Sequence, residues 1–235
     1  MRHLSRMTAP HWLALYGTLL AAWAAVWLMA VPVTGLGAAL RDLCLTPAAQ
    51  AGPGGLLAMW LIMSAAMMLP TAIPALATFD DIADAHGTGG GASLIAGYAL
   101  VWVGFSGVAM LASLASGGFG GDPRFAAALL ILAAGYQVSP VKDACLSKCR
   151  APLTFFMAHW ADGPFRMGLR LGATCLGCCW ALMALGLVGG AMSLGFMALA
   201  TVLMTLEKLS RGVFVPRAIA LVCLIGAGYL IGGTT

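Results

Sequence analysis

The sequence has few charged residues. Asp, Glu, Lys and Arg make up 9% of its 235 residues, while 61% are hydrophobic, whereas a soluble domain carries roughly 25% charged residues. This scarcity excludes an ordinary water-soluble globule, because too little polar surface is available to cover it. The apolar runs are too long for the core helices of a soluble protein, and they recur along the whole chain. The composition therefore predicts an integral membrane protein.

The apolar runs lack the alternation of barrel strands, and only helices and closed barrels span a bilayer. We therefore expect an all-α fold, a single domain over residues 1–235 that forms a polytopic transmembrane helical bundle. We expect about seven spans, each close to the ~20 residues that a bilayer requires, and the first is expected to be retained rather than cleaved as a signal peptide. The expected spans are 12–32, 56–78, 93–115, 124–141, 167–189, 192–208 and 213–232.

Basic residues are distributed unevenly among the expected loops. If the N-terminus is cytoplasmic, only Arg41 and Arg124 fall on the outer side. Because Lys and Arg concentrate on the cytoplasmic side of membrane proteins, we expect an N-in, C-out protein of the inner membrane. The same bias explains the net charge of +4 without a nucleic-acid partner. The basic residues on the inner side are Arg2, Arg6, Lys142, Lys148, Arg150, Arg166, Arg170, Lys208, Arg211 and Arg217.

The longest cytoplasmic loop, residues 142–166, contains the stretch APLTFFMAHW. This stretch is apolar but too short to span, so we expect it to lie along the inner interface. Phe155, Phe156 and Trp160 are expected to face lipid, and His159 is expected to be a polar-face residue rather than a metal ligand.

Motifs of familiar enzymes are missing as well. The sequence has no P-loop, dinucleotide fingerprint, nucleophile elbow or C-x-x-C-H haem site, so we assign no catalytic residues. Ionisable residues are nearly absent from the spans, with Glu207 and Lys208 as the main exceptions at the inner end of the sixth. They are either an interfacial pair that reaches water, or polar groups that pair with the basic loop or orient a ligand.

Cysteine, in contrast, is grouped. Cys145 and Cys149 lie at the cytoplasmic end of the fourth span, while Cys44 and Cys223 are isolated. We expect no structural disulfide between these thiols, because the cytoplasm is a reducing compartment. We interpret Cys145 and Cys149 as an entry or exit site for a metal ion.

The fifth span carries the motif Cys175-x-x-Cys178-Cys179. At about 100° per residue, the three thiols fall within one arc of about 100° on the helix, and Met183 extends the same stripe. Such spacing is poor for a disulfide and suits a soft cation, Cu(I) or Zn(II). Cysteines also pack well between membrane helices, and the preceding Gly168-x-x-x-Gly172 is a helix-contact pattern.

Methionines form a second stripe in the expected span 56–78. Met63 and Met67 share one face of a helix with Met59, while Met68 lies on another side. Methionine often only fills gaps in a core. However, Met63 and Met67 lie at about the same membrane depth as the cysteine motif, and thioether ligands beside thiolates favour Cu(I).

Three blocks combine these residues with fixed neighbours. They are Trp60-x-x-Met63-x-x-Ala66-Met67-Met68-x-Pro70; Tyr136-Gln137 with Lys142-x-x-Cys145-Leu146-x-x-Cys149-Arg150-x-Pro152; and Cys175-x-Gly177-Cys178-Cys179-Trp180-x-Leu182-Met183 with Glu207-Lys208. On these blocks the chain resembles the bacterial domain of unknown function 2182 family, described as predicted metal-binding integral membrane proteins. The resemblance covers nearly all of the chain from the second span onward, and it implies that the cysteines and methionines are family features.

The first hypothesis is therefore an inner-membrane protein that binds Cu(I) for metal handling or delivery, with Zn(II) as the other candidate ion. Its expected partners are membrane lipid, the metal ion and a membrane or metal-acceptor protein. A second hypothesis is a membrane thiol oxidoreductase that uses the cysteine pairs. A third is a non-catalytic subunit of a larger membrane complex.

Overall fold

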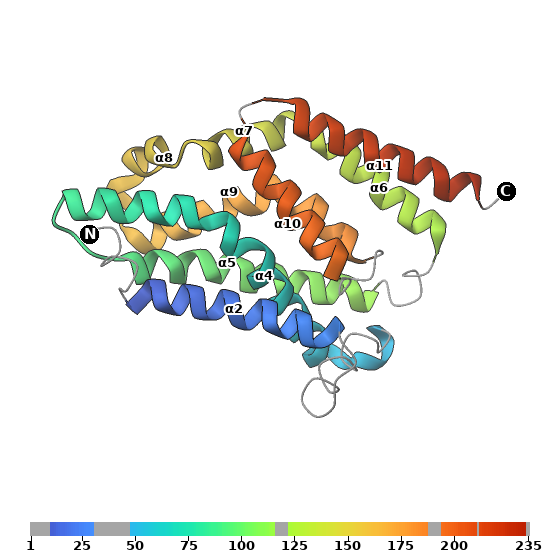
Figure 1. Ribbon diagram of the computed structural model, residues 1–235, viewed down its shortest axis with the longest axis horizontal. Coiled ribbons are helices and arrows are strands. Elements are labelled where there is room, and N and C mark those ends of the chain that lie inside the picture. Colours follow the sequence, from blue (N-terminus) through green and yellow to red (C-terminus); the bar gives the residue numbers. More distant parts are fainter. Residues whose placement is uncertain (1–9, 31–47, 116–121, 188–193, 211, 234–235) are drawn as a thin grey trace.

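A computed structural model describes residues 10–30, 48–115, 122–187, 194–210 and 212–233. The regular structure of these ranges is helical, which confirms the all-α prediction (Figure 1). The helices are α2 (Pro10–Ala30), α4 (Ala48–Ala85), α5 (Gly91–Ala115), α6 (Pro123–Gln137), α7 (Pro140–Arg150), α8 (Pro152–His159), α9 (Pro164–Ala184), α10 (Leu194–Leu209) and α11 (Phe214–Gly232), with short 3-10 turns at Trp160–Asp162 and Leu185–Leu187.

Five of these helices, α2, α4, α5, α9 and α11, are long and apolar enough to cross a membrane. Helices α6 and α7 meet at a bend of 62° and satisfy the same criterion only when they are taken together as one broken span. Helix α10 has 16 residues, which is shorter than the ~20 that a bilayer requires. The expected spans therefore correspond to helices, while the number of crossings and the N-in, C-out orientation stay predictions.

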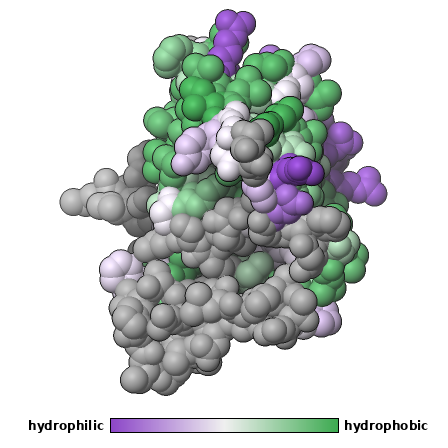
Figure 2. Space-filling model, turned by 90° about the vertical axis from the view of Figure 1, so that its right-hand side faces the viewer, coloured by the Kyte–Doolittle hydropathy of each residue, from purple (hydrophilic) through white to green (hydrophobic). Residues whose placement is uncertain are grey.

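Large apolar side chains cover much of the described surface. Leu20 of α2, Val108 of α5, and Ile225 and Tyr229 of α11 are all mostly exposed. Among the coloured residues of the face shown in Figure 2, hydrophobic side chains predominate and the polar ones are confined to small groups. A surface of this kind is compatible with insertion into a membrane.

Glycines let α9 pack directly against the backbone of α5. A Cβ atom on Gly168 would collide with the carbonyl oxygen of Leu94, and one on Gly97 would collide with that of Phe165. Neither backbone group can move aside easily, so both positions require glycine. This confirms the helix-contact role predicted for Gly168, and it fixes the depth and rotation of the helix that carries the cysteine motif.

Helix α4 continues through Pro70 because its neighbours satisfy the exposed carbonyls. Proline has no backbone N–H, so the carbonyl of Ala66 loses its usual partner. The indole Nε1–H of Trp23 donates to that oxygen at 2.9 Å. The Tyr98 hydroxyl donates to the nearby carbonyl of Met68 at 3.3 Å. These bonds tie α2 and α5 to α4 beside the methionine stripe.

The segment between α7 and α9 differs from the expectation. Phe155 and Phe156 are buried rather than facing lipid, because α8 packs against α4. Phe79 of α4 is the shared partner: its ring centroid lies 5.5 Å from that of Phe156 and 5.6 Å from that of Trp160. His159 Nδ1 is 2.8 Å from the carbonyl oxygen of Phe155, which agrees with a polar role within its own helix.

Candidate metal centre

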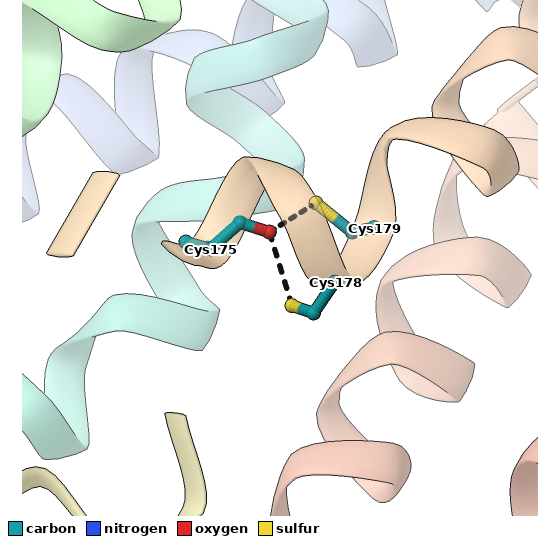
Figure 3. A group of neighbouring side chains, drawn as sticks. All are labelled: Cys175, Cys178 and Cys179. Atoms are coloured by element: carbon teal, nitrogen blue, oxygen red, sulfur yellow. Dashed lines mark hydrogen bonds between the residues drawn. The ribbon is translucent and has the colours of Figure 1, made fainter. Parts of the chain in front are cut away.

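The thiols of Cys175, Cys178 and Cys179 form a buried cluster on α9 (Figure 3). Their three Sγ atoms all lie within 4.8 Å of one another. A metal–sulfur bond of about 2.3 Å places two thiolates on opposite sides of an ion about 4.6 Å apart. The cluster therefore has the spacing that an ion held between thiolates requires, with only small side-chain shifts.

The carbonyl oxygen of Cys175 organises this cluster. Cys178 Sγ and Cys179 Sγ each donate to it at 3.0 Å, as Figure 3 shows. Both side chains thus turn back toward the same turn of α9. A thiol must lose its proton to bind a metal ion, so loading of the cluster exchanges these S–H donors for metal–sulfur bonds.

A methionine of α4 reaches the cluster. Met68 Sδ lies 3.6 Å from Cys179 Sγ, so the second and fifth expected spans do meet. Met63 and Met67 are fully buried in the same helix, but no hydrogen bond joins either sulfur to a cysteine thiol in the described part of the chain. The same holds for Met183 on α9. A ligand role for these three methionines stays a prediction.

Cysteines of α7 lie on the other side of the motif. Cys149 Sγ is 4.0 Å from Cys178 Sγ. A Cβ atom on Gly177 would lie 2.6 Å from Cys145 Sγ, so the glycine within the motif leaves room for this fifth thiol. The Cys145/Cys149 pair and the motif of α9, which the sequence predicts as separate sites, form one sulfur-rich region in the structure.

Aromatic side chains join the cysteine motif of α9 to α6. Trp180 packs edge-on against Tyr136 of α6, with ring centroids 4.9 Å apart. The Tyr136 hydroxyl donates to the carbonyl of Gly177. Helix α6 is therefore fastened to the turn of α9 that carries Cys178.

Lys208 of α10 points into the cluster rather than out to water. Its Nζ donates to Cys175 Sγ at 3.1 Å and to Thr71 Oγ1 at 2.7 Å. The Tyr98 hydroxyl lies 3.4 Å from the same sulfur. The Cys175 thiol thus contacts polar groups from two other helices, α10 and α5, and one of these groups is a cation.

Glu207, the residue before Lys208, anchors the C-terminal end of α10. Both carboxylate oxygens of Glu207 accept hydrogen bonds from Lys142 Nζ at 2.8 Å, and both side chains are almost fully buried. Arg150 donates to the Glu207 carbonyl from Nε at 2.9 Å and from Nη2 at 2.8 Å. The two alternatives predicted for Glu207 and Lys208 are thereby decided: Glu207 pairs with the basic loop, and Lys208 faces the cysteines.

A sequence model of the family described as PpoB2, copper chaperone, matches residues 57–231. The chain belongs to this family. The match confirms the prediction of a metal-handling protein and specifies copper as the metal. The name of the matched family differs from that of the domain of unknown function 2182 family, which the three sequence blocks resemble. No curated protein and no solved structure matches the chain.

The range that matches this copper chaperone family includes the thiol cluster and the sulfur and charged groups around it. These groups are Met68, Cys145, Cys149 and Lys208. Sequence reasoning assigned the three cysteines of α9 to one face, and it set aside Met68 in favour of Met63 and Met67. Helix α4 is enclosed by other helices, and Met63, Met67 and Met68 are all buried, so helical spacing alone did not identify the methionine that contacts a thiol.

Proposed function

We propose that this protein is an integral membrane copper chaperone that holds Cu(I) as cargo between the thiolates of Cys175, Cys178 and Cys179. The observation that supports this most strongly is the buried cluster of three Sγ atoms within 4.8 Å. A delivery protein needs a site that excludes water and competing hard ligands, and soft sulfur ligands provide the necessary selectivity.

Two neighbours of the cluster favour Cu(I) over Zn(II). Met68 presents a thioether beside Cys179, and thioethers are ligands of Cu(I) rather than of Zn(II). Lys208 lies beside Cys175. Three thiolates around one Cu⁺ carry an excess of negative charge, and the ammonium of Lys208 offsets part of it in a region of low dielectric.

Cys149 extends the cluster toward α7 and supplies a transfer step. Its sulfur is close enough to that of Cys178 for an ion to pass from one thiolate to the other. In the N-in, C-out orientation, Cys145 and Cys149 form the cytoplasmic entry or exit of the site. Exchange between neighbouring thiolates moves Cu(I) without a chain of charged residues in the membrane.

Metal content tests this proposal. The protein is purified anaerobically in detergent from copper-supplied cells, together with the Cys175→Ser, Cys178→Ser, Cys179→Ser triple variant. Cys223→Ser is the matched control, because Cys223 is also a buried free cysteine. We expect copper in the wild type and in the control, and little in the triple variant. Equally low copper in all three proteins contradicts the proposal, and zinc in place of copper contradicts the assignment of the ion.

The contact between Cys149 and Cys178 also favours a second candidate, a membrane thiol oxidoreductase. The two sulfurs lie 4.0 Å apart and would need to approach by about 2 Å to form a disulfide bond. This candidate predicts a reversible disulfide within the chain, formed by a membrane oxidant such as a quinone. Mass-shift alkylation that finds these thiols reduced under both oxidising and reducing conditions excludes it.

A further inference from the structure

A cavity of about 230 Å³ lies beside the cysteine cluster. Cys149 of α7 and Cys175 of α9 both line it, together with Thr71 and Tyr98. A molecule in this cavity therefore contacts two of the candidate copper ligands from different helices. Its volume is below the roughly 300–1,000 Å³ of pockets for drug-sized ligands, so it has room for the copper–thiolate end of a small complex but not for a segment of a folded protein.

The charges around the cavity are positive. Arg150 and Lys208 line it, and none of the described residues that line it is acidic. The carboxylate of Glu207, next to Lys208 in sequence, is already paired with Lys142. Two cations in a partly enclosed space repel a free Cu⁺ ion and attract an anion.

We propose that this cavity receives Cu(I) as a complex with an anionic low-molecular-mass thiol rather than as a free ion. The inference rests on the proposed copper-handling function and names the form in which the cargo arrives. A Cu(I) ion held by two thiolates has one net negative charge at the metal, and carboxylates on the thiol molecules add more. Arg150 and Lys208 attract this complex, while Cys149 and Cys175 take the ion from it.

The transfer is a pair of ligand exchanges. In the first, a Cu–S bond forms to Cys149 as one Cu–S bond to a carrier thiolate breaks, and the departing thiolate takes the proton that Cys149 releases. In the second, Cys175 replaces the other carrier thiolate in the same way. The complex [Cu(SR)₂]⁻ and two protein thiols thus become a copper site with the same charge and two free RSH molecules, and copper remains Cu(I) throughout.

Loading rates test the inference on the full-length protein in detergent or nanodiscs under anaerobic conditions. Cu(I) is offered as its complex with glutathione, with neutral 2-mercaptoethanol or with cationic cysteamine, each buffered to the same free Cu(I) concentration. We expect the glutathione complex to load about tenfold faster than the cysteamine complex at low salt, because a charged cleft raises the local concentration of an oppositely charged ligand. Added salt should reduce this difference.

Variants of α7 assign the effect to the cavity. Arg150→Gln should remove most of the preference for the anionic complex, whereas Lys148→Gln, which removes the same charge from an exposed position two residues away, should retain it. Because Arg150 also binds backbone carbonyls of Glu207 and Gly212, Arg150→Lys serves as the second variant, and it should restore the preference.

The outcomes separate the two proposals. Equal loading rates from the three thiol complexes, with a normal final copper content, overturn this inference and leave the chaperone function standing. An equal loss of preference in Arg150→Gln and Lys148→Gln also overturns it, because the effect then belongs to the surface as a whole. Failure to bind Cu(I) from any donor, including the labile acetonitrile complex, overturns the chaperone function itself.

Discussion

Met68 of α4 and Cys179 of α9 are in direct contact, with Sδ and Sγ 3.6 Å apart. The contact joins two helices that are far apart in the sequence, and it brings a thioether to the edge of the three-thiol cluster. It also distinguishes Met68 from the other buried methionines of α4 as a candidate soft ligand.

Replacing Met68 with leucine should weaken Cu(I) binding. Leucine has nearly the same volume, so the core is conserved while the thioether is lost. We expect affinity to fall by about tenfold, as measured by competition with a chromophoric Cu(I) chelator. Met63→Leu is the matched control and should bind almost normally. If Met63→Leu loses more Cu(I) affinity than Met68→Leu, then the ligand is in the Met63/Met67 stripe, as helical spacing predicts, and not at Met68.

Lys208→Met should also weaken binding, through charge rather than through a lost ligand. The ammonium lies 3.1 Å from Cys175 Sγ, and without it the excess negative charge of a copper–thiolate centre stays uncompensated. We expect a loss of about tenfold or more in affinity. Thr71→Val, which removes the hydroxyl that receives the other Lys208 hydrogen bond, should have a smaller effect of the same sign. Wild-type affinity in Lys208→Met would show that the charge plays no part.

The ion pair between Lys142 and Glu207 should matter chiefly for stability. Both side chains are almost fully buried, so Lys142→Met leaves an unpaired carboxylate and should cost about 3–5 kcal/mol of unfolding free energy. The double variant Lys142→Met, Glu207→Leu removes both charges and should recover most of that loss. Thermal unfolding in detergent measures both effects. A double variant no more stable than the single one would mean that the pair is not the source of the loss.

The crossing of α5 and α9 should depend on its glycines. Gly168→Ala forces a methyl group against the backbone carbonyl of Leu94, and we expect it to lower stability by about 1–3 kcal/mol and to lower copper content with it. Gly104→Ala, on the other helix of this pair, α5, meets no atom within 4 Å and should leave both unchanged. Similar melting temperatures for the two variants would contradict the close helix contact.

Much of this arrangement follows from local sequence. Cys175, Cys178 and Cys179 are neighbours on one helix, so helical geometry alone brings their thiols together. Gly168 is likewise identified by its spacing from Gly172. The helical segments follow from the lengths of the apolar runs.

The remaining features depend on tertiary contacts that no local pattern contains. The sequence predicts that Phe155 and Phe156 face lipid, but both are buried, and Phe156 packs against Phe79 of α4. Lys208 is directed at Cys175 because Glu207 and Arg150 hold the end of α10 against α7. Cys44 lies outside the described residues. Amphipathic spacing shows which side chains share a face, whereas the partner of that face depends on how helices pack.

The most direct test is X-ray absorption at the copper edge of the Cu(I)-loaded, full-length protein, with the triple serine variant measured alongside. We predict an edge typical of Cu(I) and a first coordination shell of sulfur in the wild type, and the loss of that shell in the variant. A shell of nitrogen or oxygen, or a sulfur shell that survives the loss of Cys175, Cys178 and Cys179, would contradict the assignment of the copper site.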